Sequence, residues 1–364
     1  VKDYNGNFAT ANLTIGRNGS PINGANTADP KIKTDGASVV LVYVDASQGW
    51  VATQDDSSDI IGAQFLEATG GAVTECGNCK IHTFTGPGTF SVSAVSGTAA
   101  ENEVSYMVVA GGGSGGVSDG GGGGGAGGFR ELKSPLTPYT ASPLDGYPTP
   151  GNRITVTATS FPITVGAGGA TNGGTGPAGN PGNPSVFSTL TSTGGGPGAR
   201  FRTSNDPEAA GGSGGGATGR RLAGCTPNPG GNGNTPSVSP PQGNNGGHAN
   251  TPTPSSSNDG GGGGGGATAC GTGSDYNNGA AGGAGATTNI TGSPVVYSGG
   301  GGGGSQAGTG GSGGSGGGGT GYSVASGGTA GTDNTGGGGG GGGSGVTSGQ
   351  AGGSGIVVIR YKFQ

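Results

Sequence analysis

The chain has 364 residues, of which 99 are glycine, 28% are apolar and 9% are charged. Intrinsic disorder usually combines low hydrophobicity with high charge, so this composition differs from the common form of disorder and is typical of a fibrous or repetitive protein. The net charge is −5, from 14 basic and 19 acidic residues, and no basic run exceeds two residues, which argues against a protein that binds nucleic acid.

Glycine is distributed unevenly along the chain. Residues 1–110 contain 13 of the 99 glycines, and residues 111–364 contain the other 86. The interior of the second part must therefore consist largely of backbone. Together with the strand patterns, this change predicts three units: a β-rich module at 1–60, a β-strand connector at 61–110 and a glycine-rich domain at 111–364.

The first unit has short alternating runs of apolar and polar residues. These runs predict strands at residues 13–15, 31–33, 39–44 and 50–53. A turn at 45–49 joins the last two runs into a hairpin, with Trp50 at its foot. A unit of this size has a marginal core when it is alone, and oligomerisation would supply the missing apolar contacts. Fibre proteins commonly solve this problem as trimers, so we expect a trimerising module and a homotrimer.

The connector continues with predicted strands at residues 80–84, 88–93 and 103–109. His82 lies in the first of these runs. Its place in the alternation predicts a solvent-facing strand residue rather than a catalytic one.

The third unit alternates between glycine runs and polar inserts. Glycine runs lie at 111–128, 211–216, 260–266, 299–319 and 336–345. Inserts rich in Pro, Thr, Ser and Asn lie at 132–152, 171–185, 200–210, 220–259 and 270–298. Short strands are predicted at 154–157, 163–165, 185–190, 295–297 and 355–361. No segment has helical periodicity, so we expect an all-β or fibrous fold with essentially no α-helix.

Glycine runs can fold only by pairing their backbones. A strict G-X-Y period is absent, which excludes collagen, and a flexible linker is the usual alternative for Gly/Ser tracts. Five tracts that are repeatedly interrupted by strands are not typical of one linker. A packed bundle of three-fold extended helices would direct each N–H and C=O outward to a neighbouring helix. We therefore expect a polyglycine II sandwich within residues 111–364.

No motif indicates a catalytic, cofactor or metal site. Residues 111–116 match G-x-G-x-x-G after a strand, but a dinucleotide site also needs a following helix, and further glycines follow here. With only two histidines, His82 and His248, acid–base catalysis has few candidates. We expect no enzyme activity and no cofactor.

The four cysteines, Cys76, Cys79, Cys225 and Cys270, allow three disulfide connectivities. The first two form a CxxC, which can be redox-active or half of a zinc site, but the other two lie too far apart for a zinc knuckle. Structural disulfides or inert thiols are the favoured interpretation. A disulfide between Cys225 and Cys270 would close a loop across the most Pro- and Asn-rich stretch, where a covalent link helps most.

The inserts are the candidate binding regions, because loops on a rigid scaffold commonly carry recognition. They hold aromatic, basic and amide side chains without an evident core to fill, and such side chains suit stacking on carbohydrate and hydrogen bonding to it. The candidate receptor-binding residues are Tyr139, Tyr147, Arg200, Phe201, Arg202, His248, Tyr276 and Asn277. The alternative is that the aromatic residues cover the ends of the glycine bundle.

Several segments together carry a resemblance to a known family. They are YMVVAGGG at 106–113, AGGFRE at 126–131, ITVGAGG at 163–169, SVFSTLTSTGGG at 185–196 and GGSGIVVIRY at 352–361. These segments resemble the glycine-rich domain of tailed-phage fibre and virion structural proteins. In the first unit, LTI at 13–15, TDGAS at 34–38 and LVYV at 41–44 are similar to segments of marine-phage, notably cyanophage-like, structural proteins.

The resemblance implies an adhesin that binds a host-cell surface glycan or outer-membrane protein, with the inserts as variable loops on a polyglycine II scaffold. It also implies contacts with other virion proteins at the N-terminal end and a location on the outer face of the virion, in a tail fibre. No individual receptor-contacting residue carries over, since these loops are the variable part of the family.

Two rival functions remain open at the level of sequence. One is a purely structural virion or cell-surface filament subunit without a specific receptor. The other is an ice-binding protein, since some of these are polyglycine bundles. The tracts lack the regular Gly-x-x repeat with a flat Thr or Ala face that ice binding would need.

Overall fold

The computed structural model describes residues 1–24, 29–55, 65–117, 119–171, 179–199, 209–219, 228–249, 259–344 and 348–363. Regular secondary structure in these residues consists of β-strands and two short 3₁₀ helices, η1 (Ala99–Asn102) and η2 (Pro150–Asn152). Among them there is no helix with the length and hydrophobicity needed to cross a membrane. The predicted all-β class, essentially without α-helix, is confirmed.

The N-terminal unit is built from two small antiparallel sheets. One pairs β1 (Leu13–Thr14) with β2 (Lys31–Ile32), and the other is the predicted hairpin of β3 (Val39–Asp45) and β4 (Gly49–Asp55). Among the described residues of this unit, the core consists of four buried apolar side chains, Ile22, Ile32, Ala37 and Val39. The hairpin exposes large apolar side chains on both of its faces, and this set is here called the hairpin patch: Val40, Val42, Tyr43, Val44 and Trp50.

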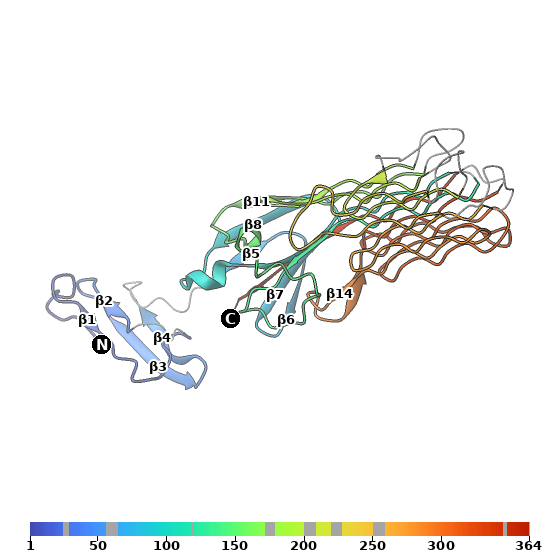
Figure 1. Cartoon of the computed structure of the whole chain (residues 1–364). Helices are drawn as coiled ribbons and strands as arrows, with labels where there is room; N and C mark the ends of the chain where they lie inside the picture. The colour runs from blue at the N-terminus through green and yellow to red at the C-terminus, as the bar shows by residue number, and fades with distance from the viewer. Residues whose placement is uncertain are drawn as a thin grey trace.

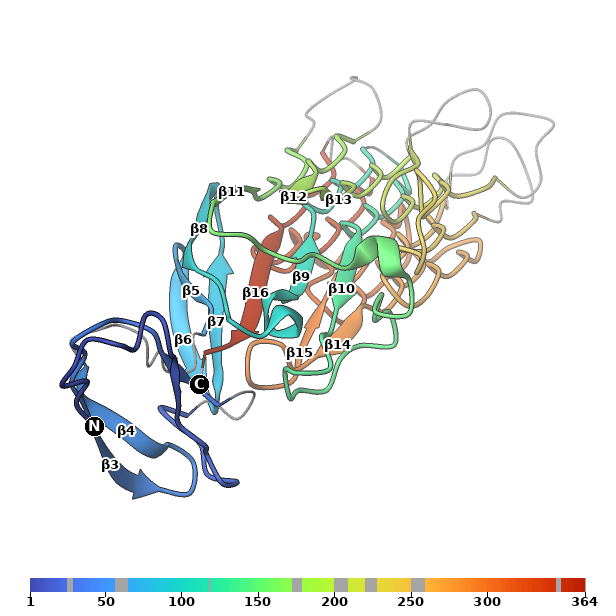
Figure 2. The same ribbon diagram turned by 90° about the vertical axis from the view of Figure 1, so that its left-hand side faces the viewer.

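The next unit is a sandwich of two five-stranded antiparallel sheets (Figures 1 and 2). The first sheet has the order β10 (Phe129–Leu132), β9 (Ser105–Val109), β16 (Ile356–Lys362), β7 (Cys79–Phe84) and β6 (Ala72–Cys76). The second has the order β13 (Leu190–Ser192), β12 (Ser185–Phe187), β11 (Ser160–Thr164), β8 (Gly88–Ala94) and β5 (Glu67–Thr69).

Strand β16 occupies the centre of the first sheet. It pairs with β7 on one side, with Ile359 opposite His82, and with β9 on the other, with Ile359 opposite Tyr106. The boundary drawn at residue 110 from composition therefore divides a single sheet. Residues 65–110 form the sandwich together with strands from the glycine-rich part, rather than a connector that stands between two other units.

The sandwich core lies between the two sheets and is made of side chains of ordinary size. The alternating patterns of β8, β9 and β16 direct one set of residues inward, including Phe90, Tyr106 and Val357. Phe187 is fully buried and packs edge-on against Phe90, Tyr106 and Phe161. Aromatic pairs in this arrangement add stabilisation beyond the apolar area that they bury.

The outer face of the first sheet is covered as well. The hairpin of β14 (Ala286–Thr288) and β15 (Val295–Tyr297) packs there with Ile290 and Tyr297 against Ile81, Met107 and Val358. This burial on both faces explains why all five residues of β9 are buried. It also leaves Arg360 only 1% exposed, where its guanidinium donates to the carbonyls of Ile290 and Pro138.

The prediction of a solvent-facing His82 is wrong. The side chain is fully buried in the sandwich, where Nδ1 lies 2.7 Å from the carbonyl oxygen of Gly70 and Nε2 lies 3.1 Å from the hydroxyl of Tyr361. The carbonyl can only accept, so Nδ1 carries the proton and Nε2 accepts from Tyr361. Burial lowers the pKa of this imidazole. The alternation of apolar and polar residues predicted one exposed face for β7. The prediction failed because β7 has side chains buried on both faces of its sheet.

Most predicted strands are present, with three differences. The run at 185–190 is two strands that turn at Ser188, which has a φ of 55°. The run at 154–157 forms only an isolated bridge from Thr155 to Glu103, although Ile154 and Val156 are buried in the core. Strands β5, β6, β10 and β14 were not predicted, because they are short or adjoin glycine.

The glycine-rich runs bond laterally, and their partners repeat every three residues. Along residues 122–127, successive N–H groups donate to three different runs and then return to the first: Gly122 to Ala199, Gly123 to Gly262, Gly124 to Gly339, Gly125 to Gly196, Ala126 to Gly265 and Gly127 to Gly336. A period of three residues is that of the extended three-fold helix. The hydrogen bonding is therefore the pattern expected of polyglycine II.

The run at 121–128 lies in the middle of this bundle. It donates to the three runs named above and accepts from three others, at 110–116, 213–216 and 301–304. A Cβ atom added at Gly123 would lie 2.1 Å from the carbonyl oxygen of Gly301, and one at Gly264 would lie 1.9 Å from that of Gly124. Glycine is required at these positions because the neighbouring backbones occupy the space of any side chain.

The bundle extends beyond the five glycine tracts seen in the sequence. Segments assigned to the inserts take part in it: Gly182 donates to Gly195, and Gly247 donates to Gly263. Short stretches that contain glycine are enough to join the bundle, because a run needs residues without side chains only where it faces its neighbours.

Three cysteines, Cys76, Cys79 and Cys270, are free thiols. Cys225, the proposed partner of Cys270, lies outside the described residues. Cys76 and Cys79 face each other across the two-residue turn between β6 and β7. No cluster of His, Cys, Asp or Glu suitable for a metal ion occurs in the described part of the chain.

Candidate functional site

The glycine bundle presents one end far from the sandwich, here called the distal end (Figures 1 and 2). At this end Gly219 donates to Gly120, and Gly304 donates to Gly121. Ala249 forms bridges to Asn228 and to Ser274. These residues come from runs far apart in sequence, so the lateral bonding gathers many chain reversals on one face of the molecule.

A rigid turn at residues 275–278 forms part of the distal end. The carboxylate of Asp275 accepts hydrogen bonds from the backbone N–H groups of Asn277 and Asn278, at 3.2 and 2.7 Å. The bond from Asn278 is the main reason that the pKa of Asp275 lies below its ordinary value. The amide oxygen of Asn278 in turn accepts from the N–H and hydroxyl of Thr309, each at 2.9 Å. The turn is thus fixed both internally and to its neighbouring run.

Tyr276 and Asn277 are carried by this turn and point away from any core. Both are exposed, and Tyr276 retains 36% of its surface. The carbonyl of Asn277 accepts from the hydroxyl of Ser305 at 2.6 Å, which holds the backbone while the side-chain amide stays free for other partners. The turn thus exposes an aromatic side chain and, at the next position, an amide side chain.

His248 lies on the neighbouring run at the same end. Its carbonyl accepts from the N–H of Ser274 at 3.0 Å, and its imidazole lies against Gly273, where an added Cβ would come within 2.3 Å of the ring. Gly273 is three residues from Tyr276. The structure therefore brings His248, Tyr276 and Asn277 to adjacent runs, although 28 positions separate His248 from Tyr276 in the chain.

The other candidates are placed differently. Arg200, Phe201 and Arg202 lie outside the described residues, and Ala199, which precedes them, donates to Gly216 within the bundle. Tyr139 and Tyr147 belong to the insert at 132–152, which packs on the sandwich and not on the distal end.

The expectation that these two tyrosines have no core to fill is wrong. Tyr139 packs against the outer face of the first sheet, its hydroxyl lies 3.3 Å from the carbonyl of Leu132, and its ring lies 5.2 Å from the guanidinium of Arg360. Burial raises the pKa of its hydroxyl far above the ordinary value. Tyr147 packs against the sandwich core, with Arg153 stacked 4.1 Å over its ring. The insert covers the sandwich because β9 and β10 would otherwise expose apolar side chains.

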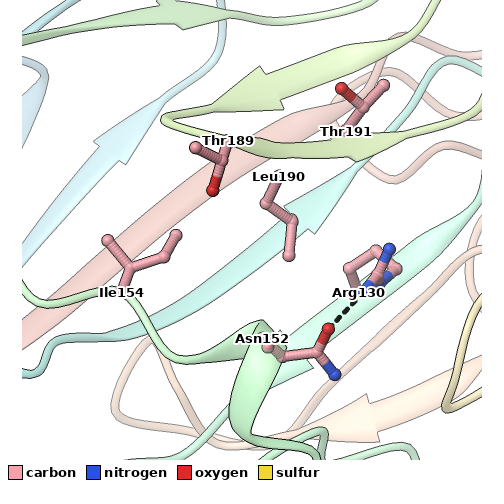
Figure 3. Close-up of a pocket in the computed structure, with 7 residues that line it drawn as sticks. Arg130, Asn152, Ile154, Thr189, Leu190 and Thr191 are labelled. Carbon is pink, nitrogen blue, oxygen red and sulfur yellow. Dashed lines mark hydrogen bonds between the residues drawn. The ribbon is translucent and has the colours of Figure 1, made fainter.

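A pocket that the sequence did not predict lies at the open edge of the sandwich (Figure 3). Its volume is about 100 Å³, and it is lined by Arg130, Gly151, Asn152, Ile154, Thr189, Leu190 and Thr191. Arg130 comes from β10, and Gly151 and Asn152 come from η2. Ile154 lies two positions after η2, and the other three residues come from the β12–β13 hairpin. Only the packing of the two sheets brings them together, so no local motif could have indicated the pocket.

The structure thus defines a class: an all-β protein in which a β-sandwich carries a laterally bonded glycine bundle. A family model described as "Glycine-rich domain" matches residues 83–362. This match covers more than half of the chain, and the protein belongs to that family of glycine-rich domains. The matched range begins near the end of β7 and ends in β16, so it includes the bundle and most strands of the sandwich, but not β5 or β6. No curated protein matches the sequence.

Proposed function

We propose that this chain is the tip of a viral tail fibre, an adhesin that binds a host-cell surface glycan or outer-membrane protein through the distal end of its glycine bundle. The observation that carries the proposal is the rigid turn at 275–278, which presents Tyr276 and Asn277 beside His248. Aromatic and amide groups held on a fixed scaffold bind with little loss of conformational entropy, because the scaffold is already ordered.

The scaffold supports this role through its rigidity. Loops that carry recognition are usually positioned by an ordered framework. Here the framework is the three-fold network of backbone hydrogen bonds, which fixes each run from several sides. The residues at the distal end can then vary while the bundle beneath them stays unchanged.

We propose a homotrimer for the assembled fibre, with other virion proteins bound at the N-terminal end. The hairpin patch supports this proposal, since it exposes several large apolar side chains on a unit with a very small core. Exposed apolar patches on small units commonly mark interaction surfaces. Three copies would also present three receptor sites, and weak individual sites gain avidity when they are linked.

Binding of labelled protein to candidate host cells tests the adhesin. Wild-type protein is compared with a Tyr276→Ala/Asn277→Ala double variant and with Tyr4→Ala as a matched control, since Tyr4 is an exposed tyrosine of the N-terminal unit. We expect the double variant to lose at least about tenfold in affinity, as for the central residues of an interface. The control should bind as the wild type does. Equal binding of all three proteins would place recognition elsewhere.

A structural filament subunit without a receptor is the alternative function, and the hairpin patch favours it equally, because apolar ends suit end-to-end assembly. Under this alternative, the protein binds no host cell or glycan, while its mass in solution increases with concentration. A defined mass near three times 33.6 kDa would instead support the trimeric fibre.

A further inference from the structure

The pocket at the open edge of the sandwich contains a cation without an acidic partner. Arg130 is half-buried on β10, and in the described part of the chain its guanidinium forms no ion pair. Its one side-chain hydrogen bond runs from Nη2 to Oδ1 of Asn152 at 2.8 Å. A guanidinium has five N–H donors, so four remain for a ligand or solvent. Burial lowers the pKa of this group, which reflects the unfavourable placement of its charge.

The orientation of Arg130 is fixed by its neighbour. The Nδ2 group of Asn152 donates to the carbonyl of Ser239 at 2.9 Å and lies 3.4 Å from that of Gly146. Both partners can only accept, so the amide oxygen must face the other way, toward the guanidinium. The nearest acidic residue of the same insert, Asp145, is already engaged, because its Oδ1 accepts from the backbone N–H groups of Lys133 and Tyr147.

The opposite wall supplies one hydroxyl group and a small apolar surface. Thr189 and Thr191 lie on the β12–β13 hairpin across from Arg130 and Asn152; the hydroxyl of Thr189 points toward the pocket, whereas the side chain of Thr191 points to the other side of the hairpin (Figure 3). Both threonines are exposed, and neither hydroxyl bonds to another described residue. Ile154 and Leu190 form the apolar part of the lining. The pocket therefore combines an oriented cation, one available hydroxyl and an apolar floor.

We propose that this pocket binds the carboxylate of an acidic sugar, such as a uronic acid. A guanidinium fork matches a carboxylate in geometry, and charge-assisted pairs of this kind are about twice as strong as neutral hydrogen bonds. The Thr189 hydroxyl pairs with a ring hydroxyl of the sugar, while Ile154 and Leu190 contact its C–H face. A volume of about 100 Å³ holds the carboxylate and the adjoining ring atoms.

The site is separate from the distal end, and the proposal does not depend on the proposed function. Arg130 lies on β10, a strand of the sandwich, whereas Tyr276 is carried by the turn at 275–278, which bonds to Ser305 and Thr309 in the distal part of the bundle. Binding at the pocket can therefore be present or absent whatever the distal end recognises.

Titration of the whole chain with free sugars, followed by amide and arginine side-chain NMR shifts, tests the proposal. The probes are glucuronate, glucose as its uncharged analogue, acetate and inorganic phosphate. We expect glucuronate to shift the signals of Arg130 and Thr189–Thr191 and to bind at least tenfold more tightly than glucose or acetate. Phosphate binding as tightly as glucuronate would overturn the acidic-sugar assignment, as would shifts confined to other regions.

Variants give an independent readout. Arg130→Gln should weaken glucuronate binding at least tenfold, and Arg130→Lys should weaken it less, because the charge remains while the fork is lost. Arg153→Gln is the matched control, since this exposed guanidinium stacks on Tyr147 in the same region, and its affinity should equal that of the wild type. Unchanged binding in Arg130→Gln would overturn the proposal. If that variant does not fold, the proposal is tested by which NMR signals of the wild-type protein shift on addition of glucuronate.

Discussion

The sandwich and the glycine bundle belong to one domain family but fill their interiors with different material. In the sandwich, side chains such as Phe90, Phe187 and Val357 bury apolar area between two sheets. In the bundle, backbones approach so closely that most glycine positions leave no room for a Cβ, and stability comes from hydrogen bonds that repeat every three residues. A chain with few apolar residues can therefore still have an ordered interior, provided that its backbone groups are paired.

The two interiors should respond to substitution in opposite ways. A side-chain core loses stability when atoms are removed, because a cavity remains. A backbone core loses stability when even one carbon is added, because the neighbouring carbonyls cannot move without breaking their own hydrogen bonds.

Gly123→Ala should have the largest effect. The added Cβ would lie 2.1 Å from the carbonyl oxygen of Gly301 in the middle of the bundle. We expect a loss of about 4 kcal/mol or more in the free energy of unfolding, at the upper end of single substitutions. Thermal unfolding and the yield of soluble protein measure it. The control is Gly327→Ala, where nothing lies within 4 Å of the added carbon and the change should stay within about 0.5 kcal/mol. Equal stability of the two variants would contradict the backbone-core description.

Phe187→Ala tests the other interior. This side chain is fully buried among Phe90, Tyr106 and Phe161, and its removal should cost about 3–5 kcal/mol. Phe187→Leu keeps most of the apolar area and should cost clearly less. Unfolding in denaturant measures both variants. A loss below 1 kcal/mol for the alanine variant, on the order of a surface substitution, would show that the sandwich does not depend on side-chain packing.

The pH dependence of stability provides the third test. Burial lowers the pKa of His82 from its ordinary value of 6.5, so the unfolded chain takes up this proton more readily than the folded one. The contribution to stability is therefore complete above about pH 6.5 and declines as the pH falls below that value. Denaturant unfolding between pH 7.5 and 4.5 should show the decline in the wild type. This decline in the free energy of unfolding should be smaller in His82→Gln. An equal decline in both proteins would mean that other titratable groups cause it.

Thiol reactivity is the mildest test and leaves stability unchanged. Cys270, in the bundle, is exposed, whereas Cys79, in the sandwich, is fully buried. A thiol reagent applied to the native protein should modify Cys270 rapidly and Cys79 only on unfolding. Peptide mapping by mass spectrometry distinguishes the sites. Rapid modification of Cys79 in the native protein would mean that this edge of the sandwich opens readily.

The fold could be predicted from sequence to the extent that local patterns determine it. Strands such as β3 and β16 are visible as apolar runs, and the excess of glycine indicated lateral backbone pairing before any partner was known. The pairing of β16 with β7 and β9 could not be predicted, because it joins segments separated by some 250 residues and no local pattern records which strands are neighbours.

The candidate site was predictable to a smaller degree. His248, Tyr276 and Asn277 were chosen by residue type, and the bundle brings them to adjacent runs. Tyr139 was chosen by the same rule but packs on the sheet, since residue type alone does not distinguish an exposed aromatic from one that covers a core. Arg130 was not singled out, because its significance depends on the absence of an acidic neighbour in space.

The central position of β16 has a consequence for biosynthesis. The ribosome makes β16 after every other strand of the sandwich, and all the residues of the bundle are translated between β9 and β16. At typical rates of about 5–20 residues per second, on the order of 10–50 seconds pass between the synthesis of β9 and that of β16, the strand that pairs with both β7 and β9. The nascent sheet has two unpaired apolar edges during that interval. Protection of those edges by a chaperone, or by the glycine runs that emerge first, would therefore govern how much of the protein is produced in soluble form.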